Sequence, residues 1–279
     1  MQSNPYDLQP LFRLDGQVAV VTGGAGVLCS AMGHVLAAAG AQVVLLDRFA
    51  DKAAEIAQAI CAEGGQAVGM GTDVLKKEAL QESCDQIIRQ FGKVDILING
   101  AGGNHPGATT SPDQSFFDLD VTAVEKVFAL NFTGTFLASQ VFARQMAVQK
   151  SGVILNIASM NSLRPLTRIP AYSAAKAAVV NFTQWLAVHM AQEYSPTIRV
   201  NALAPGFFLT EQNRFLMIDQ ATGESTPRGK KVLDHTPMNR LGDPSDLFGA
   251  MLWLVSPASS FVTGIVVPVD GGFSAYSGV

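Results

Sequence analysis

The chain has 279 residues, enough for one large α/β domain with a substantial core. Hydrophobic residues make up 48% of it and charged residues only 15%, which excludes a disordered protein. The formal net charge is −4 and no basic run exceeds two residues, so the chain lacks the electrostatic signature of nucleic-acid binding.

Residues 1–13 are expected to form an N-terminal tail. The first ten residues contain no Lys or Arg and no apolar run, so we expect no signal peptide and a cytoplasmic protein. Residues 17–46 contain no Asp, Glu, Lys or Arg, but five glycines and several polar residues interrupt them. That composition is typical of a buried strand, loop and helix rather than a membrane span, so no membrane association is expected.

Seven apolar, β-branched runs alternate with segments of helix length. They cover residues 18–21, 43–46, 67–70, 96–98, 153–157, 198–201 and 265–269. This alternation predicts a doubly wound (Rossmann-type) α/β fold with a parallel seven-stranded sheet and helices on both faces, in one domain over residues 14–279. Residues 211–236 form the longest interruption, and we expect a lid-like excursion there with one or two short helices.

The three cysteines, Cys29, Cys61 and Cys84, lie 32 and 23 residues apart. This spacing matches neither a zinc pattern nor an even-numbered disulfide set. We therefore expect free thiols in a reducing compartment, and no metal site.

The Gly-rich segment Thr22-Gly23-Gly24-Ala25-Gly26-Val27-Leu28-Cys29 follows the first strand and opens a helix. Glycines let the backbone approach a pyrophosphate, and the helix N-terminus offers free N–H groups and a positive dipole end. Asp47 ends the second strand 25 residues after Thr22, where a carboxylate binds both ribose hydroxyls of an adenosine. Together these features predict a dinucleotide site.

A carboxylate at residue 47 repels the 2′-phosphate of NADP, so NAD(H) is favoured over NADP(H). Arg48 is the counter-argument, because its guanidinium is able to pair with that phosphate. The alternative, which we favour, is that Arg48 is a solvated charge at a strand end.

Tyr172 and Lys176 are four residues apart in a segment of helical character, which stacks them on one helix face. A phenol is a poor base at neutral pH unless a nearby cation stabilises the phenolate, and Lys176 is such a cation. Ser159 follows the fifth strand, at the sheet edge where doubly wound folds bind ligands, and its hydroxyl is suited to polarising a carbonyl oxygen.

These motifs, in this order, resemble the short-chain dehydrogenase/reductase family over about residues 14–272. The pair Asp73-Val74 resembles the family's adenine contact, and Asn99-Gly100-Ala101-Gly102 resembles its turn after the fourth strand. Pro205-Gly206 with Thr210 resembles its nicotinamide-side loop. The resemblance implies a homotetramer or, less often, a dimer.

The resemblance implies four catalytic residues: Tyr172 as the acid/base, Lys176 lowering its pKa and binding the nicotinamide ribose, Ser159 orienting the reacting oxygen, and Asn131 connecting a proton relay. The expected cofactor-binding residues are Gly23, Gly24, Gly26, Val27, Leu28, Asp47, Arg48, Asp73, Val74, Asn99, Gly100, Ala101, Gly102, Tyr172, Lys176, Pro205, Gly206 and Thr210.

Three positions depart from the family pattern. The family usually has glycine where Val27 and Cys29 stand, and asparagine where Gly100 stands. Because the spacing from Thr22 to Asp47 is preserved, we expect altered cofactor affinity rather than loss of binding.

Five stretches, residues 159–162, 169–173, 204–214, 235–238 and 270–279, resemble a narrower group in this family, the D-mannonate oxidoreductases or fructuronate reductases. Those enzymes interconvert D-mannonate and D-fructuronate with NAD(H), which implies a sugar-acid substrate. The alternatives are a gluconate 5-dehydrogenase, a 3-oxoacyl-carrier-protein reductase and, from another class, a non-catalytic NAD(H)-binding sensor.

A hexonate carries a carboxylate and many hydroxyls, so its pocket needs a cation and several polar side chains. The candidate substrate residues are Asn104, His105, Asn161, Arg164, Arg168, Gln212, Asn213 and Arg214. Each arginine taken alone is more often a surface charge, and His105 is equally suited to a loop position satisfied by backbone. We hypothesise that Arg168 or Arg214 pairs with the substrate carboxylate.

Overall fold

A computed structural model describes residues 7–209, 214–220 and 222–278. Its seven strands form one sheet in the order β3-β2-β1-β4-β5-β6-β7, and every neighbouring pair is parallel. The strands are β1 (Val18–Thr22), β2 (Gln42–Asp47), β3 (Gln66–Gly71), β4 (Ile96–Asn99), β5 (Gly152–Ile157), β6 (Ile198–Pro205) and β7 (Val266–Val269). The predicted doubly wound α/β fold is confirmed.

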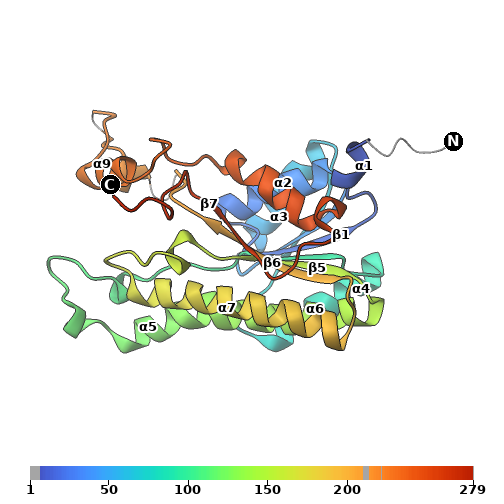
Figure 1. Cartoon of the computed structure of the whole chain (residues 1–279). Helices are drawn as coiled ribbons and strands as arrows, with labels where there is room; N and C mark the ends of the chain where they lie inside the picture. The colour runs from blue at the N-terminus through green and yellow to red at the C-terminus, as the bar shows by residue number, and fades with distance from the viewer. Residues whose placement is uncertain (1–6, 210–213, 221, 279) are drawn as a thin grey trace.

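The α-helices cover both faces of the sheet. They are α1 (Gln9–Phe12), α2 (Val27–Ala38), α3 (Ala50–Ala62), α4 (Lys77–Phe91), α5 (Val121–Phe128), α6 (Gly134–Gln149), α7 (Pro170–Glu193), α8 (Arg214–Met217), α9 (Pro227–Asp234) and α10 (Phe248–Val255). Helices α2, α3 and α10 lie on one face, and α4, α5, α6 and α7 lie on the other (Figure 1). The layers are those of a Rossmann-type domain.

The two faces of the sheet have separate hydrophobic cores, and consecutive residues of a strand alternate between them. In β1, Ala19 and Val21 enter the core on the α2 face, whereas Val18 and Val20 enter the core on the α4 face. All five residues of β1 are buried, which explains why the strand is a continuous apolar run.

The predicted tail and excursion contain short helices in the structure. Helix α1 lies within residues 1–13, and its apolar Leu11 and Phe12 remain more than a third exposed. Helices α8 and α9 lie in the described part of residues 211–236, beside the C-terminal end of the chain (Figure 1). Within the residues that are described, no helix is long and apolar enough to cross a membrane.

Candidate active site

A cleft of about 580 Å³ runs along the carboxyl ends of the central strands. It is lined by the β1–α2 turn, the ends of β2, β4, β5 and β6, and the first turns of α7. The expected site residues that line it are Gly23, Gly26, Val27, Leu28, Asp47, Arg48, Asp73, Val74, Gly100, Ala101, Gly102, Ser159, Tyr172, Lys176, Pro205 and Gly206. Residues far apart in the sequence therefore meet at the edge where such folds bind ligands.

The β1–α2 turn packs against the turn that follows β4. Gly23 has φ +67°, and a Cβ there would lie 2.8 Å from the Ala101 Cα atom, so only glycine fits this approach. Helix α2 then begins with Gly26 as N-cap and no side chain capping its first turn. Its first N–H groups are therefore available to an anion such as a pyrophosphate.

Asp47, the last residue of β2, binds the β1–α2 turn through its side chain. One carboxylate oxygen accepts the Ala25 N–H at 3.1 Å and the other accepts the Phe49 N–H at 3.0 Å. The Arg48 guanidinium lies 4.5 Å from the centroid of the Phe49 ring, and both side chains are exposed at the cleft. Sequence reasoning missed Phe49 and Lys52, which also line the cleft, although an aromatic residue two positions after Asp47 was a signal for Phe49.

Two of the expected cofactor residues lie behind the cleft. Asn99 is buried, and its amide donates to Ser139 and to Asn156, so it ties β4 to β5 and α6. Gly24 is buried against Leu45. Thr210 lies outside the described residues.

Tyr172 and Lys176 lie one turn apart near the start of α7. The Lys176 ammonium donates to the Ile157 carbonyl at 2.7 Å and lies 5.7 Å from the centroid of the Tyr172 ring. Because Lys176 is 3% exposed, burial lowers its pKa to about 8. The buried ammonium is thus held beside the ring of Tyr172, which is itself partly buried.

Ser159 and Tyr172 both line the cleft. Burial raises the pKa of Tyr172 above its ordinary value, and hydrogen bonding by the Ser159 hydroxyl opposes the rise. The Ser159 hydroxyl also accepts the Asn161 N–H at 3.2 Å, at the start of the turn η4 (Met160–Ser162). The lowering of the Tyr172 pKa by Lys176 stays a prediction.

Asn131 lies within a π-helical turn, η3 (Ala129–Thr133), between α5 and α6. Its fully buried amide donates to the carbonyls of Gly103 at 2.6 Å and Val127 at 2.7 Å. A Cβ on Gly102 would lie 2.7 Å from the Asn131 side-chain oxygen and 3.2 Å from the Lys176 nitrogen. The extra residue of the π turn thus brings Asn131 beside Lys176, across the turn that follows β4.

The six expected substrate residues that the structure describes lie outside the cleft lining. His105 accepts the Gly107 N–H at 3.1 Å and Asn104 donates to Thr109 at 2.8 Å, so both hold their own loop. Arg168 and Arg214 are exposed. Gln212 and Asn213 lie outside the described residues.

Two of the substrate candidates have distinctive environments. Asn161 is 6% exposed, and its side-chain oxygen has no hydrogen-bond partner among the described residues. Arg164 is exposed, and its Nε–H donates to the Ser274 carbonyl at 3.1 Å. Across the part of the chain that is described, no group of three or more His, Cys, Asp or Glu is arranged to hold a metal ion.

A family model of the short-chain dehydrogenases matches residues 17–221. UxuB, an uncharacterised oxidoreductase of Bacillus subtilis (strain 168), is 51% identical over 276 residues, covering 96% of this chain and 98% of UxuB. A crystal structure of a proposed D-mannonate oxidoreductase from Haemophilus influenza, with bound NAD, matches with a TM-score of 0.91 and 45% identity, covering 98% of this chain and 100% of the other.

A third similar protein is a gluconate 5-dehydrogenase from Burkholderia cenocepacia, solved in complex with NADP and tartrate. It matches with a TM-score of 0.85 and 33% identity, covering 96% of this chain and 99% of the other. The family match spans the β1–α2 turn, Asp47, Ser159, Tyr172 and Lys176. The chain therefore belongs to the short-chain dehydrogenase/reductase family and is an NAD(P)-dependent oxidoreductase.

Proposed function

We propose that the protein oxidises a sugar-acid alcohol to its ketone and catalyses the reverse reduction, with D-mannonate and D-fructuronate as the substrate pair. The reaction class rests on one observation: Ser159, Tyr172 and the buried Lys176 meet in one cleft, with the Lys176 nitrogen 5.7 Å from the centroid of the Tyr172 ring. The substrate rests on likeness to the proposed D-mannonate oxidoreductase, at 45% identity over nearly the whole of both chains.

The cleft fits a dinucleotide in this proposal. The uncapped start of α2 suits the pyrophosphate, Asp47 suits the adenosine ribose, and Asp73 with Val74 suits the adenine. Lys176 binds the nicotinamide ribose. Bound NAD(H) supplies the acceptor or donor of the hydride that the reaction transfers.

The protein's own residues handle the proton. In oxidation the Tyr172 phenolate takes the proton from the substrate hydroxyl, and in reduction the phenol returns it to the carbonyl oxygen. The Ser159 hydroxyl orients that oxygen, and the Lys176 cation favours the phenolate electrostatically. Asn131 is placed to continue a proton path from Lys176.

We infer that NAD(H) is preferred over NADP(H). The Asp47 carboxylate occupies the end of β2, where the 2′-phosphate of NADP would bring a second negative charge. Arg48, which is able to offset this repulsion, lies over the Phe49 ring.

A gluconate 5-dehydrogenase is the second candidate, because a protein of that name is 33% identical over almost the full length of both chains. The test measures NADH and NADPH formation with D-mannonate, D-gluconate and simple alcohols, each with NAD⁺ and NADP⁺. Activity with D-mannonate and NAD⁺ alone supports the proposal. Activity confined to gluconate or other alcohols would overturn the proposed substrate and would leave the assignment of the catalytic residues unchanged.

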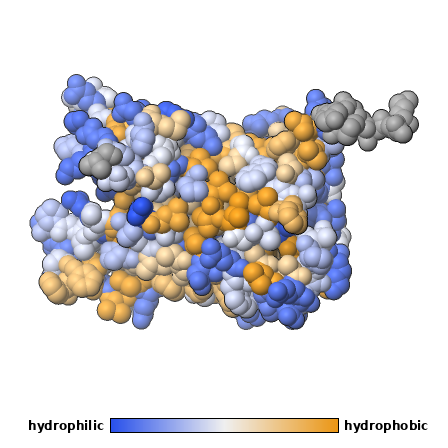
Figure 2. All heavy atoms as spheres, viewed as in Figure 1, coloured by the Kyte–Doolittle hydropathy of each residue, from blue (hydrophilic) through white to orange (hydrophobic). Residues whose placement is uncertain are grey.

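We also propose that the enzyme is a homotetramer or a dimer. A row of aromatic rings, Phe132, Phe136, Phe182 and Trp185, crosses α6 and α7, and Trp185 is 55% exposed. Apolar surface also covers the region of β7 and α10 (Figure 2). Phe261, between these two elements in the sequence, is fully exposed. Large exposed apolar areas favour association. Light scattering that gives the mass of a single chain would contradict this proposal.

A further inference from the structure

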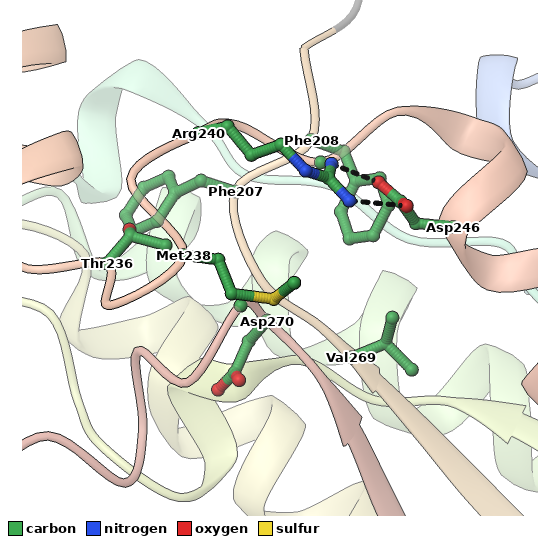
Figure 3. Close-up of a pocket in the computed structure, with 10 residues that line it drawn as sticks. Phe207, Phe208, Thr236, Met238, Arg240, Asp246, Val269 and Asp270 are labelled. Atoms are coloured by element: carbon green, nitrogen blue, oxygen red, sulfur yellow. Dashed lines mark hydrogen bonds and ion pairs between the residues drawn. The ribbon is translucent and has the colours of Figure 1, made fainter.

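Three segments far apart in the sequence meet at one place: residues 206–208 after β6, residues 235–238 after α9, and residues 270–276 after β7. Side chains of all three surround one small pocket of about 150 Å³ (Figure 3). The polar groups at this pocket are paired within the protein, since Arg240 binds Asp246 and Thr236 donates to the Val232 carbonyl. The pocket therefore marks a junction between segments.

The backbones of these segments are in direct contact. The Met238 N–H donates to the Gly271 carbonyl at 3.1 Å, and the Gly206 N–H donates to the Val269 carbonyl at 2.9 Å. A Cβ on Gly271 would lie 2.8 Å from the Thr236 methyl group, so the two segments pass each other with no room for a side chain at residue 271. The contact between the end of the excursion and the C-terminal segment is thus fixed in register.

The C-terminal segment folds back through Asp270. Its two carboxylate oxygens accept the N–H groups of Gly272 at 3.0 Å and Ser274 at 2.9 Å. This turn carries Phe273, which is 9% exposed, into an edge-on contact with Phe207 at 5.2 Å between ring centroids. The segment therefore packs on the loop that follows β6, where Pro205 and Gly206 line the cleft.

His235 joins the end of α9 to the same segment. It is the C-cap residue of α9, and its ring lies 4.7 Å from the Phe273 ring and 5.1 Å from the Tyr276 ring. Such edge-on and tilted ring contacts are favourable beyond the apolar area that they bury. The short helix α9 is thus anchored by two aromatic residues from the last turn of the chain.

Arg164 also binds the C-terminal segment. It follows Ser159 by five residues, and its Nε–H donates to the Ser274 carbonyl. Among the described residues its guanidinium makes no other hydrogen bond or ion pair, which leaves the terminal nitrogens for a ligand. A guanidinium held at Nε is pre-organised for a carboxylate.

We propose that residues 270–276, which we call the C-terminal latch, position the substrate side of the active site. The latch holds the end of α9 through His235, the loop after β6 through Phe207, and the Arg164 guanidinium through the Ser274 carbonyl. His235, Phe273 and Tyr276 are positioning residues, and Arg164 is the cation that meets the substrate carboxylate. The inference rests on the proposed function only in taking the substrate to be an acid.

The first test uses the full-length variants His235→Ala and Phe273→Ala. Hydrogen exchange of the α9 amides is expected to quicken about fivefold or more, because the anchoring ring contact is lost. The KM for the acid substrate is expected to rise about fivefold, with kcat and the Kd for NADH within about twofold of wild type. His235→Phe keeps a ring at that place and is expected to restore both values.

His189→Ala is the matched control, because His189 also lies between two aromatic rings, those of Trp185 and Tyr194, but on α7. It is expected to leave the exchange of α9 and the KM unchanged. Unchanged exchange and KM in His235→Ala would overturn the latch, and so would an equal loss in kcat and NADH affinity. If Phe273→Ala does not fold, His235→Ala and Tyr276→Ala decide the question.

Arg164→Gln is expected to raise the KM for the acid substrate about tenfold and to leave the KM for NAD⁺ within about twofold of wild type. An equal effect on both, or none, would remove Arg164 from the proposal. The kinetic tests use whichever hydroxy acid the enzyme oxidises, and hydrogen exchange needs no substrate. Inactivity with D-mannonate therefore overturns the proposed substrate without deciding the latch.

Discussion

The Cys29 thiol fills the space that a side chain at residue 100 would occupy. A Cβ on Gly100 would overlap the Cys29 sulfur and would lie 2.9 Å from the Thr22 carbonyl oxygen. Cys29 is 5% exposed, and burial raises the pKa of its thiol to about 12. Two of the three departures from the family pattern, cysteine for glycine at 29 and glycine for asparagine at 100, are therefore complementary, because one side chain is gained where the other is lost.

Gly100→Ala is expected to destabilise the protein by about 1 to 3 kcal/mol, because the added methyl group overpacks this place. In a Cys29→Ala background the same change is expected to cost about 1 kcal/mol less, since the sulfur has gone and only the Thr22 oxygen is crowded. Urea unfolding of the four proteins in the cycle measures the coupling.

Gly249→Ala is the control for this cycle. Gly249 lies in α10, and a Cβ there would have no neighbour within 4 Å, so the change is expected to be neutral or slightly stabilising. Equal destabilisation by Gly100→Ala in both backgrounds would refute the complementarity of Cys29 and Gly100.

Tyr172→Phe is expected to lower kcat by about a hundredfold or more, because the proton-transfer group is lost. NADH affinity is expected to remain, since the ring still packs against its neighbours and Lys176 keeps its bond to the Ile157 carbonyl. Steady-state turnover and a fluorescence titration with NADH separate the two effects. Tyr194→Phe, at the far end of α7, is the control. Near-normal turnover of Tyr172→Phe would overturn its assignment.

The sheet was predictable because its strands are buried on both faces and read as continuous apolar runs. The prediction ended the sixth strand at residue 201, four residues before β6 ends, because the last part of β6 owes its strand character to pairing with β7. Local patterns also placed Tyr172 and Lys176 on one helix face. Local patterns did not predict the π turn at Asn131. Nor did they predict the contact of His235 with Phe273, which lie far apart in the sequence.

The Ser159 hydroxyl lowers the pKa of Tyr172, so its removal is expected to shift pH profiles. Oxidation needs the Tyr172 phenolate and therefore rises with pH, whereas reduction needs the phenol and falls with pH. In Ser159→Ala the rise of oxidation with pH and the fall of reduction with pH are both expected to occur at higher pH than in the wild-type protein. A fall in kcat is also expected. Because burial lowers the pKa of Lys176 to about 8, the rise of oxidation with pH is expected to flatten above about pH 8, as the cation that favours the phenolate is lost.

The control for the pH profiles is Ser162→Ala, because the Ser162 hydroxyl donates to the backbone carbonyl of Ser159 and not to Tyr172. Ser162→Ala is expected to keep the wild-type pH dependence of both oxidation and reduction. A Ser159→Ala profile that moves to lower pH, or stays in place, would show that Ser159 does not set the protonation of Tyr172.

Asp47→Asn is expected to reduce the preference for NAD⁺ over NADP⁺ by about tenfold, since one like-charge repulsion near the 2′-phosphate is worth on the order of 1.4 kcal/mol. Asparagine keeps a side-chain oxygen for the Ala25 N–H, so the β1–α2 turn is expected to hold its shape. The measurement is the ratio of kcat/KM for the two cofactors. Asp51→Asn, in the first turn of α3, removes an equal charge outside the cleft lining and controls for net charge. If both variants change the ratio equally, the preference comes from the overall field of the protein and not from Asp47.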